Sequence, residues 1–207
     1  MICGVSSDTQ VLFYNAEHRI CRKRADELRD DDSLFAVKFK NETCLCHTSA
    51  SILRASSAAS SNASLLLHIG MSHGKVLKCT PAQRVLKYTG NPTKILELCA
   101  DEDDYESDDE DEDEDEVVQV EMVAADALNV GDYVVCYDSD YSKYSGEAEF
   151  RKYKFVAFHE YGYGYHHLVR VNSVGTGGSD EHFSFFVSGR PGTAVADCGV
   201  VFDVAAA

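Results

Sequence analysis

Residues 74–86, with the sequence G-K-V-L-K-C-T-P-A-Q-R-V-L, are the part of the chain that decides the fold. Their first half holds the short apolar run Val76, Leu77 and Cys79, which suits one arm of a hairpin. The Thr80-Pro81 pair then interrupts the run, because proline cannot donate a hydrogen bond to a strand ladder. A second apolar run starts at Arg84. Gly70 and Gly74 favour a tight turn between residues 65–69 and residues 75–79, which would be the two arms of a hairpin. The stretch predicts a β-hairpin whose second arm turns a corner into a further strand.

Short apolar runs rich in Val, Tyr and Phe extend this pattern along the chain. Residues 50–64 differ, and we expect a loop there, because their Ser and Asn side chains compete for backbone hydrogen bonds. No internal repeat of fixed period is visible. Many short strands with Gly and Asn turns predict an all-β, mainly antiparallel fold with one closed core and the two chain ends close together. The expected strands are residues 9–14, 34–39, 65–69, 75–79, 84–88, 95–99, 117–122, 133–137, 152–159, 167–174 and 182–187.

The negative charge of the chain is concentrated in one segment. Residues 101–116 carry 14 acidic side chains, and removing them from the formal net charge of −16 leaves −2 for the remainder. Like charges at this density, with no apolar face to bury, predict a disordered insertion. The insertion either binds a basic protein or only aids solubility. Elsewhere the sequence has no basic stripe, so we expect no nucleic-acid binding.

The eight cysteines are expected as free thiols. The N-terminus has no apolar run of signal-peptide length, and no segment approaches the ~20 apolar residues of a membrane span. We therefore expect a cytoplasmic or nuclear protein that does not bind membranes, with reduced cysteines. Cys44, Cys46 and His47 lie closer together than the usual zinc ligands, and no second pair follows at finger spacing, so no metal is expected.

Four segments, in this order, resemble the Hint domain, which inteins and hedgehog autoprocessing modules share. They are Cys3 with the S-S-D-T-Q-V-L that follows, the Thr-Pro corner, residues 124–135 (A-A-D-A-L-N-V-G-D-Y-V-V), and residues 182–189 (H-F-S-F-F-V-S-G). The resemblance implies one compact Hint-like domain over residues 1–198, interrupted by the acidic residues 101–116. Residues 199–207 are expected as a C-terminal tail or a remnant of a flanking protein. No homing endonuclease is expected, because only a short charged insert occupies its usual place.

The resemblance implies that the domain acts once, on its own flanking polypeptide and without a cofactor. Cys3 would attack the carbonyl of Ile2 and turn the peptide bond into a thioester. Thr80 and Gln83 match the Thr-x-x-His positions that polarise this bond, and Gln83 should point at the backbone beside Cys3. An amide can donate a hydrogen bond but cannot transfer a proton near neutral pH. A one-residue shift of the alignment would instead put Gly4 at the nucleophile position.

The nearest match to the C-terminal junction of inteins is Asp197-Cys198. Cys198 would be the second nucleophile, in the same pocket as Cys3 and Thr80, and Asp197 would replace the usual Asn. Two functions remain open: cis-acting autoprocessing in an impaired form, and a degenerate Hint-fold module that binds partners through its acidic loop. An unrelated all-β structural or regulatory protein is the third alternative.

Overall fold

The computed structural model describes residues 3–30, 32–39, 45–58, 65–90, 120–138, 154–159, 162–177, 181–187 and 192–206. Nearly all of their regular structure is β, and no described helix is long and apolar enough to span a lipid bilayer. The described strands are β1 (Val5–Ser6), β2 (Gln10–Tyr14), β3 (Ile20–Arg24), β4 (Ser33–Phe39), β5 (Leu45–Ala58), β6 (Leu67–Met71), β7 (Val76–Cys79), β8 (Arg84–Tyr88), β9 (Val120–Ala124), β10 (Tyr133–Asp138), β11 (Lys154–His159), β12 (Gly162–Thr176), β13 (His182–Val187), β14 (Gly192–Val195) and β15 (Val201–Ala206). Two single 3-10 turns are described, η1 (Ala25–Glu27) and η3 (Ala125–Ala127).

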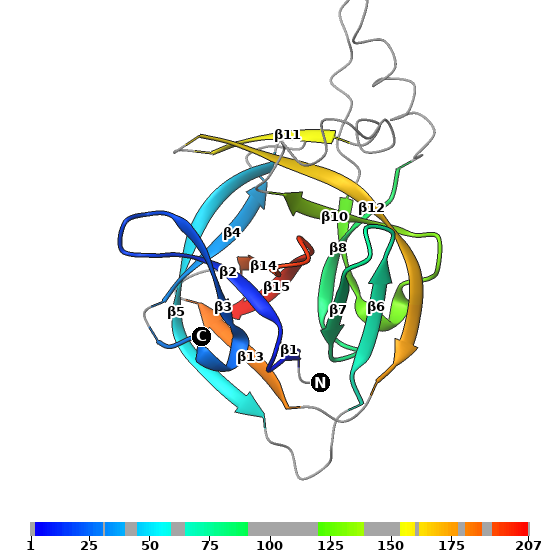
Figure 1. The fold of residues 1–207 in the computed structure, drawn as a ribbon, viewed down its shortest axis with the longest axis horizontal. Helices are drawn as coiled ribbons and strands as arrows, with labels where there is room; N and C mark the ends of the chain where they lie inside the picture. The colour runs from blue at the N-terminus through cyan, green and yellow to red at the C-terminus, as the bar shows by residue number, and fades with distance from the viewer. Residues whose placement is uncertain are drawn as a thin grey trace, which may run out of the picture.

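The strands form one continuous, strongly curved system that wraps around a common interior (Figure 1). The long strands β5 and β12 form much of the outer wall, while β1 and β7 pair near the middle. Most described pairs are antiparallel, and the parallel exceptions are β5 with β11 and β13 with β15. The prediction of a single all-β, mainly antiparallel fold is confirmed.

The hairpin and corner predicted from residues 74–86 are both present. β6 pairs with β7 from Leu67↔Cys79 to Gly70↔Val76, and Gly74 has a φ of 83°, which only glycine adopts without strain. After β7 the Gln83 N–H donates to the Thr80 carbonyl at 3.0 Å, which closes the corner before β8 begins. This turn places the Thr80 hydroxyl beside Gly4, near the N-terminal end of the chain.

Two sequence-based expectations were wrong at the level of elements. Residues 50–58 lie in β5 instead of a loop, because that strand pairs with β4 along one edge and with β13 along the other. The ladder hydrogen bonds outweigh the weak strand preference of Ser and Ala. Residues 201–206 are not a tail: they form β15, which pairs with β8, β13 and β14.

The structure also contains an internal repeat that has no fixed period in the sequence. After β3 and again after β9, the chain makes the same 3-10 turn and returns to the loop that precedes β2 or β8. The equivalent hydrogen bonds run from Ala25 N to Thr9 O at 2.8 Å and from Ala125 N to Gln83 O at 2.8 Å. The spacing differs because the second copy contains the long segment with the acidic residues.

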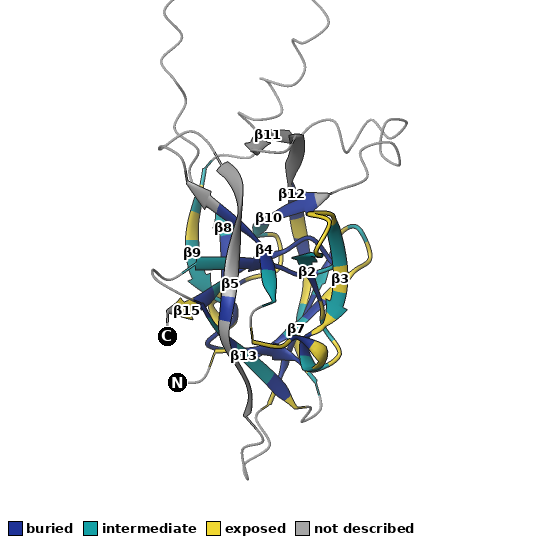
Figure 2. Ribbon diagram, turned by 90° about the vertical axis from the view of Figure 1, so that its left-hand side faces the viewer, coloured by how far each residue is buried: buried dark blue, intermediate teal, exposed yellow. Residues whose placement is uncertain are grey.

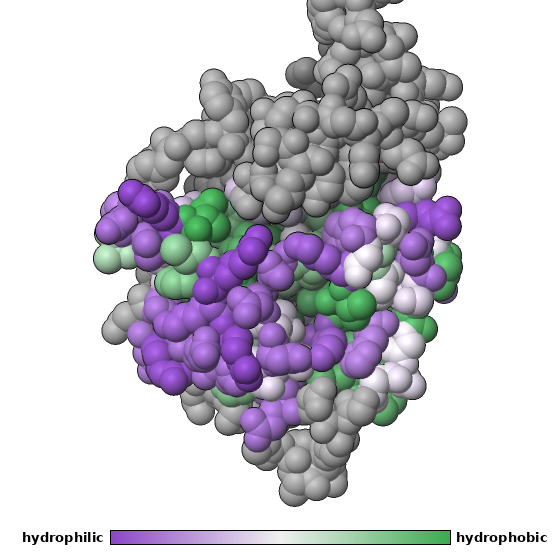
Figure 3. Space-filling view, in the orientation of Figure 1, coloured by the Kyte–Doolittle hydropathy of each residue, from purple (hydrophilic) through white to green (hydrophobic). Residues whose placement is uncertain are grey.

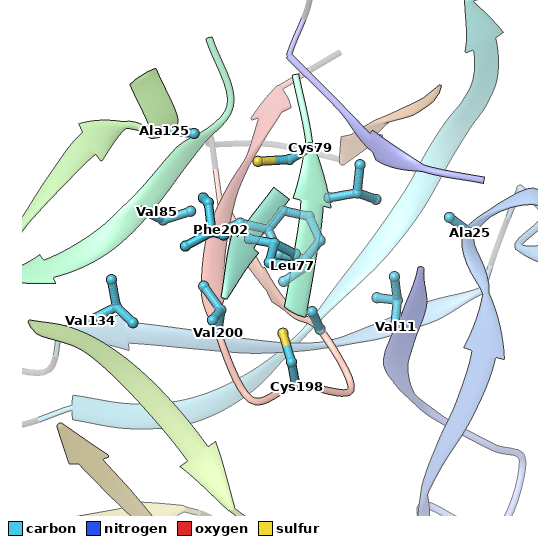
Figure 4. Close-up of a cluster of buried hydrophobic side chains, with 14 of the residues drawn as sticks. Val11, Ala25, Leu77, Cys79, Val85, Ala125, Val134, Cys198, Val200 and Phe202 are labelled. Atoms are coloured by element: carbon cyan, nitrogen blue, oxygen red, sulfur yellow. The ribbon is translucent and has the colours of Figure 1, made fainter. Parts of the chain in front are cut away.

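The core consists of apolar side chains from nearly every described strand (Figure 2). Phe202 of β15 is 1% exposed and packs at the centre of the larger cluster, with Leu77 and Val85 near it (Figure 4). The outer face over β2 and β3 is hydrophilic (Figure 3), and its arginines form ion pairs. These pairs are Arg19–Glu17, Arg22–Asp197 and Arg24–Asp26.

Three expectations fall outside the described residues. They are the disordered insertion at residues 101–116, the strand at residues 95–99, and the side chains of Cys44, Cys46 and His47. Among the described residues, no group of three or more His, Cys, Asp or Glu side chains is placed to hold a metal ion.

Candidate functional site

The N-terminal end of the chain and the last strand line one cavity of about 260 Å³. Its polar or reactive lining residues are Cys3, Gln83, Ser184 and Asp203, and Gly4 also lines it. Cys3 is exposed, and its Sγ donates a hydrogen bond to the Ala82 carbonyl at 3.3 Å. The two ends of the chain therefore lie close together, as the sequence predicted, and Figure 2 shows both on the same side of the molecule.

Two hydroxyl groups hold the peptide bond between Cys3 and Gly4. The Gly4 N–H donates to Thr80 Oγ1 at 3.1 Å, and on the other side of the bond the Ser184 hydroxyl donates to the Cys3 carbonyl oxygen. The Thr80 N–H also donates to the Gly4 carbonyl at 2.9 Å. The corner residue Thr80 is thus fixed against the peptide that follows Cys3.

The space beside Gly4 is too small for a side chain. A Cβ atom built on Gly4 would lie 2.7 Å from the Phe183 carbonyl oxygen and 3.1 Å from His182 Cδ2. A larger residue would therefore require β13 to move. Of the two alignments that the sequence left open, only the one with Cys3 as nucleophile supplies a reactive side chain in this cavity.

The Gln83 side chain points at the last strand instead of the Cys3 backbone. It is 2% exposed, and its Nε2 donates to Asp203 Oδ1 at 2.7 Å, to the Asp203 carbonyl at 3.0 Å and to the Arg84 carbonyl at 3.1 Å. Both amide hydrogens are therefore engaged away from Cys3. The position that would carry an imidazole in a Thr-x-x-His motif instead anchors Asp203.

The electrostatics of the cavity disfavour the thiolate form of Cys3. Partial burial and the nearby Asp203 carboxylate both raise the pKa of Cys3. Burial also raises the pKa of Asp203, although Arg84 and Gln83 oppose the rise through hydrogen bonds and charge. Because the thiolate is the attacking species, a raised thiol pKa leaves less of it at neutral pH.

Cys198 and Asp197 lie at a different cavity, of about 270 Å³, which Cys3 does not line. Cys198 sits in the turn between β14 and β15, close to Val200 in the apolar cluster (Figure 4), and burial raises its pKa to about 11. Asp197 is half-buried, and its Oδ1 pairs with Arg22 Nε at 2.8 Å. The expected meeting of Cys198 with Cys3 does not occur, because Cys198 lines the cavity of Asp8 and Lys75 whereas Cys3 lines that of Gln83 and Asp203.

Sequence reasoning missed Asp203, Ser184 and His182. Asp203 had one local signal, since it interrupts the apolar run V-V-F-D-V at residues 200–204. A lone carboxylate in a buried strand normally has partners, and here these are Gln83 and the Arg84 N–H at 3.2 Å. Ser184 and His182 gave no signal, because their contacts with residues 3 and 4 depend on the pairing of β1 with β13.

Comparison with solved structures identifies the architecture. The DnaB intein from Synechocystis aligns with a TM-score of 0.56 at 15% identity, over 98% of this chain and 99% of that chain. An intein from a hyperthermophile aligns with a TM-score of 0.58 at 12% identity, again over 98% and 99%. The chain has the Hint fold. A mini-intein of transcription factor IIB from Mvu also aligns, with a TM-score of 0.53 at 12% identity over 98% and 99%. No protein-family model and no curated protein matches the sequence.

In this Hint fold the residues around Cys3 come from three separate parts of the chain. The β7–β8 corner supplies Thr80 and Gln83, β13 supplies Ser184, and β15 supplies Asp203. An exposed thiol, a peptide bond held by two hydroxyls, and a partly buried carboxylate can together support acyl transfer on the backbone itself. The described residues of the cavity offer no imidazole in the Gln83 position.

Proposed function

We propose that this chain is a cis-acting self-processing domain that cuts its own backbone through an N-to-S acyl shift at Cys3. The Cys3 thiol attacks the carbonyl of the preceding residue, the peptide bond becomes a thioester, and water or an added thiol then releases the N-terminal peptide. The substrate is the polypeptide that flanks the domain. The observation that supports this best is the cavity where Cys3 faces both the Thr80 corner and the last strand.

The reaction is expected to be slow. Gln83 cannot protonate the departing amine, and loss of a positioned acid commonly costs ~10²–10⁴ in rate. The raised pKa of Cys3 reduces the thiolate further. Because Cys198 is buried at another cavity, we propose N-terminal cleavage without the second transfer that complete splicing requires. The proposed reaction does not use Cys198 as a second nucleophile or Asp197 as a cyclising residue. Both roles remain predictions.

The test is release of an N-terminal tag, followed by intact mass spectrometry with and without dithiothreitol. We expect thiol-dependent release in the unmodified chain and none after Cys3→Ala. Cys21→Ala is the matched control, because Cys21 lies on β3 away from the cavity, and it should not alter release. Thiol-dependent release that persists after Cys3→Ala would exclude the mechanism.

A second candidate function is a Hint-fold binding module that has lost processing. The engagement of both Gln83 amide hydrogens by Asp203 and Arg84 favours it, because the corner then serves to hold β15 in place. In this case the acidic residues 101–116 recruit a basic protein. An unchanged intact mass in every sample, together with salt-sensitive binding of a basic peptide, would support this function over self-processing.

A further inference from the structure

The peptide bond between Cys3 and Gly4 has a second set of neighbours that the proposed function does not use. β1 pairs with β13 at Val5↔Phe183, so the start of β13 runs beside residues 3 and 4. His182 and Ser184 are two residues apart on β13 and therefore project from the same side of the strand. The Ser184 hydroxyl reaches the Cys3 carbonyl oxygen, and His182 Cδ2 packs against Gly4. One strand thus contacts both halves of this peptide bond.

The His182 imidazole is buried, and part of its hydrogen-bonding capacity is unused. The residue is 1% exposed, and Nε2, the ring nitrogen bonded to Cδ2, has no hydrogen-bond partner among the described residues. Buried polar atoms are normally paired, so an unpaired one needs an explanation. Burial lowers the pKa of His182, which keeps the ring neutral at pH 7. A neutral imidazole can accept a proton and then return it.

We propose that the Cys3–Gly4 bond is a second labile bond of the cavity, hydrolysed with Ser184 stabilising the carbonyl oxygen and His182 carrying the proton. His182 would then supply the proton transfer that Gln83 cannot. This hydrolysis goes beyond the acyl shift at Cys3, because it uses another bond and another nucleophile. It needs water as its one co-reactant, and the cavity beside Cys3 and Gly4 gives water a route to the bond.

Hydrolysis begins when the oxygen of one water molecule bonds to the carbonyl carbon of Cys3, and the C=O electron pair moves to the oxygen that Ser184 contacts. His182 accepts the proton that the water loses and delivers it to the Gly4 nitrogen as the C–N bond breaks. Thr80 Oγ1, already 3.1 Å from that nitrogen, holds it during departure. The products are a peptide ending in the Cys3 carboxyl group and a chain that begins with the Gly4 amine.

The experiment uses the full chain with an N-terminal tag and the Cys3→Ala substitution, which removes the thiol route but keeps the backbone carbonyl. Intact mass identifies the product, since chains that begin at residue 3 and at Gly4 differ by one residue mass. We expect the product that begins at Gly4. His182→Gln should lower its rate of formation by ~10²-fold or more. Ser184→Ala should lower it by ~10²-fold, as loss of an oxyanion donor does.

His68→Gln is the matched control. His68 lies on β6, and its Nε2 also lacks a hydrogen-bond partner among the described residues, but β6 pairs with β7 and β12 and so does not run beside residues 3 and 4. We expect this control to process at the parent rate. Circular dichroism checks that each variant is folded, and if His182→Gln unfolds, the more exposed Ser184→Ala decides the question.

Two results would overturn this inference. One is that no chain beginning at Gly4 forms from Cys3→Ala over several days. The other is that folded His182→Gln and Ser184→Ala both process at the parent rate. Failure of the acyl shift is recognised differently: the chain that retains Cys3 would then give no thiol-trapped product. The two reactions can therefore fail or succeed independently.

Discussion

At the scale of single residues, Gln83 is the position that would limit the proposed acyl shift. It occupies the position from which an imidazole would assist cleavage, yet it donates hydrogen bonds to Asp203 and to the Arg84 carbonyl. The Cys3 thiol lies in the cavity, but the turn between β7 and β8 offers no residue that can protonate the departing amine. The identity of this position could be predicted from the Thr-x-x-His spacing. Its contact with Asp203 could not, because the two residues are 120 positions apart in the sequence.

Replacing Gln83 with histidine should accelerate release of the N-terminal tag. The new imidazole has an ordinary pKa of about 6.5 and can transfer a proton near neutral pH. We expect a gain of at least tenfold, within the ~10²–10⁴ that a positioned acid supplies. Gln10→His is the control, since Gln10 lies on β2 at the other cavity. No gain from Gln83→His, or an equal gain from Gln10→His, would contradict the prediction.

Neutralising Asp203 should lower the pKa of the Cys3 thiol. The carboxylate is one of the causes that raise this pKa, whereas an asparagine would keep an oxygen for the Gln83 hydrogen bond. The pH at which Cys3 becomes half-reactive towards iodoacetamide should therefore fall in Asp203→Asn, as measured by peptide mapping. Glu17→Gln, in the hairpin between β2 and β3, should leave it unchanged. An upward shift in Asp203→Asn would show that the carboxylate favours the thiolate.

At the scale of elements, the two equivalent turns depend on one carboxylate each. Asp132 Oδ2 accepts the Asn129 N–H at 2.8 Å and pairs with Lys87 Nζ at 3.0 Å. In the other copy Asp32 accepts the Arg29 N–H at 2.7 Å and pairs with Lys23 at 2.8 Å. Asp32 thus ties its turn to β3, the strand that precedes the turn, whereas Asp132 ties its turn to β8, which pairs with both β9 and β10. The sequence carries the same repeat as the pattern A-D-x-L-x-x-x-D, at residues 25–32 and again at residues 125–132.

Removing either carboxylate should destabilise the fold by a similar amount. We expect Asp132→Ala and Asp32→Ala each to lower the free energy of unfolding by ~1–2 kcal/mol, mostly through the lost hydrogen bond to the backbone. The ion pairs add less, because solvent screens them partly. Urea denaturation measures the change, with the exposed Glu121→Ala on β9 as control. A difference of more than about 2 kcal/mol between the two variants would contradict the equivalence of the turns.

The sequence predicted the elements whose own residues signal a turn or a strand. It did not predict the elements that form only because they pair with distant strands. The β6–β7 hairpin follows from its glycines and its apolar runs, and the corner follows from Thr80-Pro81. β5 was predicted as a loop because its Ser and Ala residues have weak strand preference, although its two neighbouring strands supply the ladder. β15 was predicted as a tail, yet its Phe202 lies in the core. Both β5 and β15 are strands because they pair with segments far away in the sequence. The contacts of Cys3 depend on such long-range pairing in the same way.

At the scale of the whole molecule, the acidic segment lies in a connection whose length the fold does not restrict. β8 and β9 are antiparallel neighbours, and their ladder runs from Arg84↔Ala124 to Tyr88↔Val120. The acidic residues 101–116 fall between Tyr88 and Val120, beyond the open end of this ladder. The described strands on either side are thus held together by their own hydrogen bonds. Nothing in the β8–β9 pairing depends on the length of the connection.

Deleting residues 101–116 should leave the fold intact and raise its melting temperature slightly. The deletion roughly halves the connection between β8 and β9, which reduces the entropy cost of closing it by about 0.6 kcal/mol. For a chain of this size that free energy corresponds to a shift of ~1–3 °C. Removing 14 like charges also relieves repulsion near the domain. Circular dichroism melting of the full chain and the deletion variant measures the effect.

A Gly-Ser segment of equal length is the matched control, because it removes the charge but keeps the length. If the entropy of closing the connection dominates, this control has the melting temperature of the parent chain, and only the deletion variant has a higher one. If charge repulsion dominates, both variants melt higher than the parent chain. This difference shrinks as salt is added, since salt at 0.1 M screens exposed charges that lie more than about 10 Å apart. A fall of more than a few degrees in both variants would mean that the acidic residues pack on the domain, because burying carboxylates is tolerated only against cationic partners. The acidic segment would then be part of the folded domain, and its proposed role of recruiting a basic protein would fail with it.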